Sequence, residues 1–242
     1  MSKVRLDRLA VERGLVPSRE RARALILAAR VTVDGHVVTK AGTQVEPDAS
    51  VALTAPDHGF VGRGGLKLAH ALETFHIAVT GRDALDIGAS TGGFTDVLLQ
   101  RGASRVVALD VGHGQLDWTL RNDPRVVVIE HFNARHLTPA DLPGPVDLVC
   151  IDVSFISLRQ ILPVVPPLLR PGADVVALVK PQFEAGRAEV RDGVIRDETV
   201  RTRVLTEIGT AAAAVGLTTA AVTPSPITGQ KGNVEFLLHL RA

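Results

Sequence analysis

Four charged residues stand at the ends or edges of apolar segments, where charge is unusual. They are Lys67 in GRGGLKLAHAL, Asp152 at the end of VDLVCID, Lys180 at the end of VALVK and Glu235 in GNVEFLLHL. Desolvating an ammonium or a carboxylate without a partner is costly, so a charge at such a place needs an explanation. Neighbouring ammonium and carboxylate groups can transfer a proton or stabilise a developing charge, and they can equally be ion pairs that cap strand ends.

Asp152 and Lys180 follow apolar runs that are neighbours in the expected order of a parallel sheet. The carboxyl ends of parallel strands lie at one edge, so we expect these two side chains to meet there. Glu235 joins them if the last strand inserts beside the fifth. Pro181 follows Lys180 and ends the strand, which directs the lysine out of the sheet.

The segment LDIGASTGGFTDVLL (85–99) has the pattern of a strand, a glycine-rich turn and a helix. Cofactors of doubly wound sheets bind beyond the carboxyl ends of strands, where glycine lets the backbone approach closely. Gly88, Gly92 and Gly93 lack the second glycine of the dinucleotide pattern G-x-G-x-x-G. Asp86, before the turn, is instead typical of S-adenosylmethionine (SAM) sites, where a carboxylate helps to hold the cationic methionine end.

Two further residues follow the next strands of the predicted sheet. Asp110 ends RVVALD, where a carboxylate can accept hydrogen bonds from a ribose diol. Asn133 follows the third strand, where such enzymes contact adenine, although asparagine is also an ordinary turn residue. A tight turn without a ligand is the alternative for the glycine cluster. We predict a SAM site that comprises Asp86, Gly88, Ala89, Ser90, Gly92, Gly93, Phe94, Asp110 and Asn133.

The elements that position these residues are visible as apolar runs that alternate with segments of helical character. The runs are DALDIG, RVVALD, RVVVIE, VDLVCIDV, ADVVALV, TAAVT and VEFLLHL. This alternation is typical of a parallel α/β sheet covered by helices on both faces. We therefore predict, over residues 63–242, a SAM-dependent methyltransferase domain with a Rossmann-like, mostly parallel seven-stranded sheet.

The start of the chain has a different character. Residues 1–30 carry eight basic and three acidic groups, although the net charge of the chain is only +1. Apolar residues at helical spacing predict two short helices, and Asp34-Gly35 between β-branched residues predicts a hairpin. A basic head of this kind favours a polyanion-binding module, and two solvated amphipathic helices are the alternative. We predict a small α+β domain over residues 1–55 and a linker over 56–62.

This head resembles the alpha-L RNA-binding motif, which was first described in a ribosomal small-subunit protein. The matching strings are R-L-D-R-L-A, S-R-E-R-A-R-A-L-I and V-D-G. In that family the arginine-rich helix faces RNA phosphates, as expected for charge-driven backbone binding. Arg63, next to Gly64 and Gly65, either holds a phosphate or belongs to a plain hinge. The RNA contacts that we expect are Arg5, Arg8, Arg19, Arg21, Arg23 and Arg63.

Composition narrows the class of protein further. The single Cys150 excludes an internal disulfide, and its apolar surroundings favour a buried hydrophobe over a nucleophile. No apolar segment approaches the roughly 18 residues that span a bilayer, and the N-terminus lacks a signal-peptide pattern. The eight histidines show no metal-ligand spacing. We expect a cytoplasmic protein without a metal centre; the oligomeric state is left open.

The K-D-K-E set of charged residues resembles that of the FtsJ-type ribose 2′-O-methyltransferases. Over residues 1–242 the chain resembles the haemolysin A (TlyA) family, on the strings G-R-G-G-L-K-L, D-I-G-A-S-T-G-G-F, D-V-G-H-G-Q-L, D-V-S-F-I-S, V-K-P-Q-F-E and G-N-V-E-F. Its members use SAM to methylate ribose 2′-hydroxyls of rRNA, with the best-known target cytidines in both subunits. The resemblance implies an rRNA substrate in the 30S or 50S subunit and catalytic roles for Lys67, Asp152, Lys180 and Glu235.

A ribose 2′-hydroxyl is a poor nucleophile, so it must be deprotonated or stabilised as it attacks. We expect Lys180 to take the proton or to stabilise the alkoxide, while Asp152 and Glu235 orient the lysines. A methyltransferase acting on an RNA base is a rival, but the DVSF string lacks the two prolines usual in base-amine enzymes. A non-catalytic RNA-binding or ribosome-assembly protein is a second rival. A pore-forming toxin is a third, without a membrane-seeking segment to support it.

Overall fold

The computed structural model describes residues 3–27, 29–54 and 59–242. The chain divides into two compact units, residues 1–59 and 60–242, and each has its own hydrophobic core. The predicted linker over 56–62 lies partly outside the described residues, which do not include 56–58.

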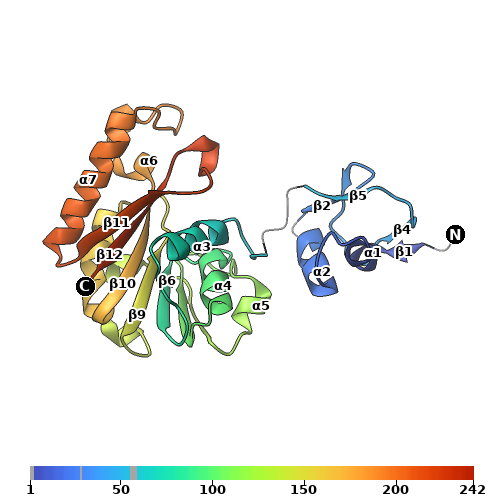
Figure 1. The fold of residues 1–242 in the computed structure, drawn as a ribbon, viewed down its shortest axis with the longest axis horizontal. Helices are drawn as coiled ribbons and strands as arrows, with labels where there is room; N and C mark the ends of the chain where they lie inside the picture. Colours follow the sequence, from blue (N-terminus) through green and yellow to red (C-terminus); the bar gives the residue numbers. More distant parts are fainter. Residues whose placement is uncertain (1–2, 28, 55–58) are drawn as a thin grey trace. The chain divides into compact units, whose positions relative to one another are not determined.

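The N-terminal unit packs two helices against short strands (Figure 1). Its elements are β1 (Val4–Arg5), α1 (Leu6–Glu12), α2 (Arg19–Leu27), β2 (Val31–Val33), β3 (His36–Val37), β4 (Gln44–Val45) and β5 (Val51–Leu53). Strand β1 pairs with β4, and β3, β2 and β5 form a second antiparallel sheet in that order. Asp34 and Gly35 both have positive φ, as a two-residue hairpin turn requires, so the predicted hairpin is confirmed.

Helices α1 and α2 bury their predicted apolar stripes. The buried apolar residues are Leu6, Leu9, Ala10, Ala22, Leu25 and Ile26. Ala29 belongs to the same sequence stripe, but the prediction that it continues the helix is wrong. Helix α2 ends at Leu27, and Ala29 is exposed with a φ of 58°.

The larger unit is an α/β domain built on a seven-stranded sheet within the described residues. Its main elements are α3 (Gly64–Thr74), β6 (Asp83–Ile87), α4 (Gly93–Gln100), β7 (Arg105–Leu109), α5 (Trp118–Arg121), β8 (Val126–Ile129), β9 (Val146–Ile151), β10 (Leu169–Val179), α6 (Pro181–Glu184), α7 (Glu198–Ala214), β11 (Thr218–Pro224) and β12 (Phe236–Arg241). The strand order is β11-β12-β10-β9-β6-β7-β8, and β12 runs antiparallel to both of its neighbours. The predicted mostly parallel sheet is confirmed.

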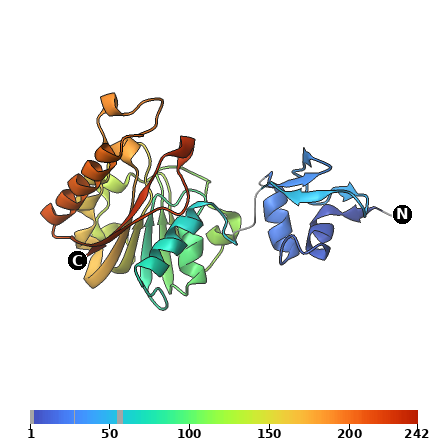
Figure 2. The same ribbon diagram turned by 45° about the horizontal axis from the view of Figure 1, so that its top comes forward.

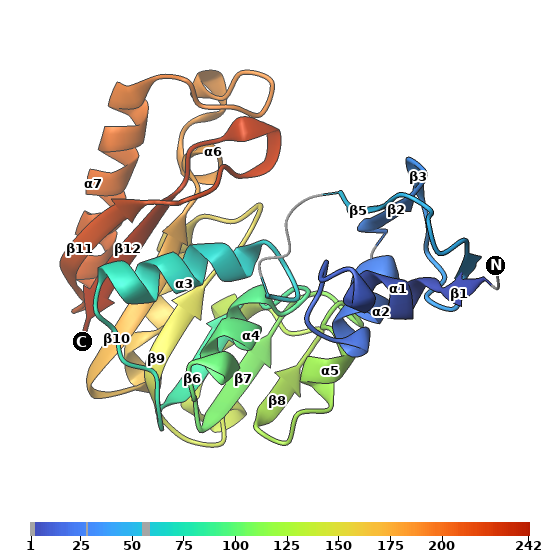
Figure 3. The same ribbon diagram turned by 45° about the vertical axis from the view of Figure 1, so that its right-hand side comes forward.

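Helices cover both faces of this sheet (Figures 1 and 2). One core contains Leu85 and Ile87 of β6 together with Val204 and Ile208 of α7. The other contains Ala84 of β6 with residues of α3 and α4, and Figure 3 shows α3 lying across that face. Successive β6 residues enter opposite cores because side chains alternate along a strand.

The connection from β9 to β10 departs from the expected helical pattern. It is made of three 3-10 turns, η3 (Leu158–Gln160), η4 (Leu162–Val164) and η5 (Pro166–Leu168). Pro163, Pro166 and Pro167 lack the backbone N–H that an α-helix needs, so the segment forms short turns instead. Four further 3-10 turns are η1 (Ala134–His136), η2 (Pro139–Asp141), η6 (Arg187–Glu189) and η7 (Gln230–Gly232).

Candidate active site

Lys180 meets Asp152 at the carboxyl edge of the sheet, as expected from the parallel pairing of β9 and β10. Each residue directly follows its strand, and Lys180 Nζ lies 2.6 Å from Asp152 Oδ1. The contact is an ion pair without the alignment of a hydrogen bond, because that oxygen has no hydrogen-bond partner among the described residues. Lys180 also donates to Ser154 Oγ at 2.8 Å. With 8% of its surface exposed, Lys180 keeps a buried charge close to two polar partners.

Lys67 and Glu235 form a second buried pair near the same edge. Lys67 Nζ donates to Glu235 Oε2 at 2.5 Å, and the two residues are 9% and 3% exposed. Glu235 comes directly before β12, which pairs with β10 as the sequence required for it to join the site. The strand begins at Phe236, two residues after the start of the predicted run VEFLLHL. Gly229 makes room for this carboxylate, since a Cβ there would lie 2.0 Å from Glu235 Oε1.

The first turn of α3 connects the two ion pairs. A Cβ on Gly64 would lie 3.9 Å from Asp152 Oδ2, so the start of α3 packs directly against the Asp152 carboxylate. Lys67 follows Gly64 by three residues, about one turn further along the same helix. The fold therefore brings four charged side chains, from α3 and from the ends of β9, β10 and β12, to one edge of the sheet.

A cavity of about 550 Å³ opens beside Asp152, and a smaller one of about 130 Å³ adjoins it, whereas Lys67, Lys180 and Glu235 line neither. Gly88, Ser90 and Asp152 line both. The larger volume lies in the range of small-molecule sites. Of the residues predicted for the cofactor, those that line one or both cavities are Gly88, Ala89, Ser90, Gly93, Phe94, Asp110 and Asn133.

Gly88 and Gly92 are required by the backbone of the glycine-rich turn. Gly88 has a φ of 89°, and a Cβ there would lie 2.4 Å from the backbone oxygen of Asp152. Gly92 has a φ of 97° and packs against Leu120. Both positions demand glycine on steric grounds. Gly92 is buried away from the cavities, so the structure does not bring it to the predicted cofactor contact.

Asp86 also lines neither cavity. It is fully buried and accepts from Thr95 N at 2.9 Å and Thr95 Oγ1 at 2.7 Å. Its Oδ1 has no hydrogen-bond partner among the described residues. Burial raises the pKa of Asp86 to about 7, opposed by the Thr95 hydrogen bonds and reinforced by the negative charges of Asp152 and Asp110. The carboxyl group thus joins β6 to the first turn of α4.

Asp110 and Asn133 lie on the wall of the larger cavity. Asp110 accepts from Ser90 N at 2.8 Å and from Gly112 N at 2.7 Å, which fixes the carboxylate beside the glycine-rich turn. Asn133 caps η1 by accepting from Arg135 N. Each carboxylate oxygen has more than one lone pair, so Asp110 retains acceptor capacity for a diol. The Asp110 carboxylate, the Asn133 amide and the size of the cavity fit the adenosine part of SAM.

Sequence reasoning missed several residues of the cavity wall. Gln115 accepts from Ser90 Oγ, and Phe132 supplies an aromatic surface. Ser154 and Phe155 also line the cavity. The string DVSF signalled these last two without a role for either. No helix in the described residues has the length and apolar character to cross a membrane, and no group of three metal-binding side chains occurs there.

The predicted RNA-binding arginines of the N-terminal unit are largely engaged with acidic residues. Asp7 is fully buried and pairs with Arg5 at 2.8 Å and Arg19 at 3.2 Å. The hydrogen bonds from Arg5 lower the pKa of Asp7 to about 2, and Arg19 adds to this effect against the cost of burial. Arg8 pairs with Glu12 at 2.6 Å.

The remaining predicted RNA contacts are placed differently. Arg23 is exposed on α2, and Arg21 is half-buried on the same helix. Arg63, in the larger unit, is exposed at the start of α3 and donates to the carbonyl of Thr228. Arg5 and Arg19 are therefore fixed by the buried Asp7, whereas Arg23 and Arg63 are exposed at the surface.

The strand order, with its antiparallel β12, and the glycine-rich turn beside a cavity define a Rossmann-like methyltransferase domain. Comparison with known proteins agrees: residues 60–242 match the FtsJ-like methyltransferase family, and residues 4–51 match the S4 domain. The chain therefore belongs to the haemolysin A (TlyA) family of FtsJ-like methyltransferases, as its relatives show over nearly its whole length.

Three of these relatives illustrate the similarity. The 16S/23S rRNA (cytidine-2′-O)-methyltransferase TlyA of Mycobacterium tuberculosis is 49% identical over 99% of this chain and 90% of its own. Hemolysin A of Brachyspira hyodysenteriae is 42% identical over 98% of this chain and 99% of its own. The solved structure of a candidate hemolysin from Streptococcus thermophilus has a TM-score of 0.77 at 43% identity, covering 100% of this chain and 89% of that one.

Proposed function

We propose that this protein transfers a methyl group from SAM to a ribose 2′-hydroxyl of rRNA, at a cytidine. The observation that carries the proposal is the buried Lys180, which contacts Asp152, a residue of both cavity walls, and Ser154, a residue of the larger one. The name of the 49% identical relative, a 16S/23S rRNA (cytidine-2′-O)-methyltransferase, supports the substrate. Such a substrate implies action in the cytoplasm, on 30S or 50S subunits.

Residues of this chain would hold the cofactor across the two cavities. Asp110 would accept from the ribose diol and Asn133 would meet the adenine in the larger cavity. The small residues Gly88, Ala89 and Gly93 leave space in the smaller cavity for the methionine end. When bound, SAM supplies an electrophilic methyl group on its sulfonium.

Lys180 would act on the oxygen that attacks this methyl group. An ammonium has three N–H donors; one is given to Ser154 Oγ, and the Asp152 carboxylate is held as an ion-pair partner without an aligned hydrogen bond. An N–H that is not given to Ser154 can point at the 2′-oxygen. The carboxylate 2.6 Å away offsets the cost of burying the ammonium. We therefore assign Lys180 the role of stabilising negative charge on the 2′-oxygen, with Asp152 as the nearest acceptor for the hydroxyl proton.

Lys67 and Glu235 would support this site from the other side. Their pair places a second cation and a second carboxylate at the same edge without adding net charge. Because both are buried, each holds the other in a single orientation. We assign them the positioning of the substrate ribose and of the start of α3.

The test is methyl transfer from labelled SAM to isolated 30S and 50S subunits by the purified chain. Mass spectrometry of the rRNA nucleosides then identifies the product. The proposal predicts 2′-O-methylcytidine at a defined position in at least one subunit. A methyl group on a base nitrogen instead of the ribose would contradict the proposal and indicate an RNA base methyltransferase. Tight rRNA binding without any transfer would indicate a non-catalytic RNA-binding protein.

A further inference from the structure

The segment that follows β9 contributes much of the larger cavity and contacts Lys180. Residues 153–157, here the β9 loop, include the cavity-lining Val153, Ser154, Phe155 and Ile156. Ser154 is the residue whose hydroxyl accepts from Lys180 Nζ. The position of the β9 loop therefore determines whether the lysine keeps its second polar partner.

The backbone of the β9 loop is strained at one residue. Phe155 has a φ of +62°, a left-handed value that is rare for a bulky side chain, and it is 85% exposed. Because most of its surface faces solvent, burial of the Phe155 side chain alone contributes little to holding this conformation. Other contacts must hold the β9 loop in place.

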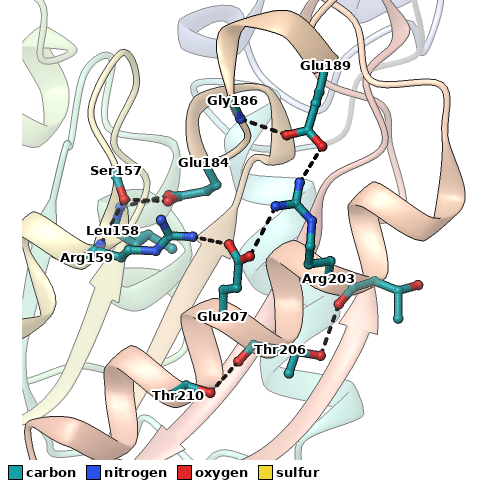
Figure 4. Close-up of polar contacts among 11 residues, drawn as sticks. Ser157, Leu158, Arg159, Glu184, Gly186, Glu189, Arg203, Thr206, Glu207 and Thr210 are labelled. Carbon is teal, nitrogen blue, oxygen red and sulfur yellow. Dashed lines mark hydrogen bonds and ion pairs between the residues drawn. The ribbon is translucent and has the colours of Figure 1, made fainter.

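Glu184 makes those contacts from the neighbouring element. It is the last residue of α6, the short helix that begins directly after Lys180, and it is 8% exposed. Glu184 Oε2 accepts from Ser157 Oγ, and Oε1 accepts from Leu158 N at 2.8 Å, as Figure 4 shows. Both carboxylate oxygens are thus bonded to the segment where the β9 loop ends.

The residue before Glu184 contacts the other part of the loop. The rings of Phe183 and Phe155 lie 5.0 Å apart at an angle of 49°. Consecutive residues of α6 therefore touch the β9 loop at two points, and Lys180, just before α6, touches it at a third. A rotation or shift of α6 would move all three contacts together.

Keeping a carboxyl group at this place has a cost. Burial raises the pKa of Glu184, and the hydrogen bonds from Ser157 and Leu158 offset this only in part. An apolar residue would avoid that cost and would leave the backbone N–H of Leu158 without a partner. The carboxyl group is therefore retained for the two hydrogen bonds that it accepts.

We propose that Glu184 is a positioning residue of the methyl-transfer site: it holds the β9 loop so that Ser154 stays against Lys180. The inference rests on the proposed function. Glu184 acts through Ser157 and Leu158 and does not line either cavity. Its removal should therefore lower the rate of transfer by displacing Ser154, without removing a group that contacts the substrate.

A matched control is available on the outer side of the same region. Glu207 of α7 accepts from Arg159 at 2.5 Å and from Arg203 at 3.2 Å, and Arg203 also pairs with Glu189 (Figure 4). Its side chain is 37% exposed. Exposed ion pairs contribute little to stability, so Glu207→Ala should leave the β9 loop and the activity unchanged.

The experiment compares Glu184→Ala, Glu184→Gln, Ser157→Ala and Glu207→Ala with the wild type, in the full chain. Rates of methyl transfer to ribosomal subunits are normalised by the number of SAM-binding sites, so that unfolded protein does not count. Glu184→Ala is expected to lower kcat roughly ten- to hundredfold, with a smaller change in KM for the subunits. Ser157→Ala, which removes one hydroxyl, is expected to give an intermediate loss.

Glu184→Gln separates positioning from charge. Its amide oxygen can accept from Leu158 N while its NH₂ group donates to Ser157 Oγ, so near-wild-type kcat is expected. Hydrogen exchange supplies a readout that does not depend on activity. The amide of Leu158 should lose protection in Glu184→Ala and keep it in Glu207→Ala.

Wild-type kcat per SAM site in Glu184→Ala, or unchanged protection of Leu158, would overturn the assignment of Glu184. A wild-type protein that transfers no methyl group to either subunit would instead overturn the proposed function, and the kinetic role of Glu184 with it. Loss of protection at Leu158 in that case would leave Glu184 as a structural clamp only.

Discussion

Lys180 Nζ lies 2.6 Å from Asp152 Oδ1, although the two residues follow different strands, β10 and β9. The pair exists because these strands run parallel and adjacent, which brings their carboxyl ends together. The same edge holds the second ion pair and the wall of the cavities. Charge, cavity and strand ends thus coincide at one place in the fold.

The Lys67–Glu235 pair allows stability and activity to be separated. Glu235→Ala leaves the buried Lys67 ammonium without its carboxylate, which should cost about 3–5 kcal/mol in urea denaturation. The double variant Lys67→Met with Glu235→Leu should recover most of that stability, because a buried pair can be replaced by apolar residues. Methyl transfer should remain low in both. A double variant with restored activity would show that the pair is only structural.

Asp86 should make the stability of the larger unit depend on pH. Its pKa rises from 3.8 to about 7 on folding, so between these values the folded state holds a proton that the unfolded chain has released. Stability should therefore fall as pH rises through this window, by a few kcal/mol at about 1.4 kcal/mol per pKa unit. Asp86→Asn should flatten the profile.

Denaturation at pH 4.5, 6 and 7.5 measures this slope. Asp197→Asn is the control, because Asp197 is an exposed cap of α7 whose pKa is lowered by hydrogen bonds from Thr199. That variant should keep the wild-type slope between pH 5 and 7. An Asp86→Asn protein with the slope of the wild type would contradict the placement of Asp86 as a buried, protonated group.

Arg23 should contribute to RNA binding through charge. It is exposed on α2, whereas Arg8 on α1 is paired with Glu12. Arg23→Ala should weaken rRNA binding and reduce the slope of log K against log salt by about 1, as expected for one phosphate contact. Arg8→Ala should change the slope less. Filter binding from low to moderate salt measures both, and equal slopes for Arg23→Ala and the wild type would exclude the contact.

The contact between Asp152 and Lys180 was predictable because strand order in an α/β sheet follows from the alternation of its elements. The direct pairing of Lys67 with Glu235 was not, since it depends on how α3 lies against a strand that is distant in sequence. Local pattern also placed the glycine-rich turn correctly, while the burial of Asp86 behind it depends on Thr95 in the next helix.

The count of basic and acidic residues in the N-terminal unit predicted less of the structure than the strand and turn patterns did. The charge pattern of the basic head predicts arginines that face RNA, but Asp7 is buried and binds both Arg5 and Arg19. A count cannot show which cations an internal carboxylate holds. The partners of Glu184 could not be predicted either. In the string KPQFE it is one polar residue among others, and its hydrogen bonds depend on the path of the β9 loop.

The central claim is that the Lys180 ammonium stabilises the attacking 2′-oxygen. The most direct measurement is the rate of 2′-O-methylcytidine formation in ribosomal subunits by Lys180→Met, normalised to SAM-binding sites and compared with Lys231→Met on the exposed η7 turn. The account predicts a loss of roughly 10²–10³-fold for Lys180→Met with SAM binding retained, and wild-type rate for Lys231→Met. A folded, SAM-binding Lys180→Met protein that methylates the ribose at near-normal rate would contradict it.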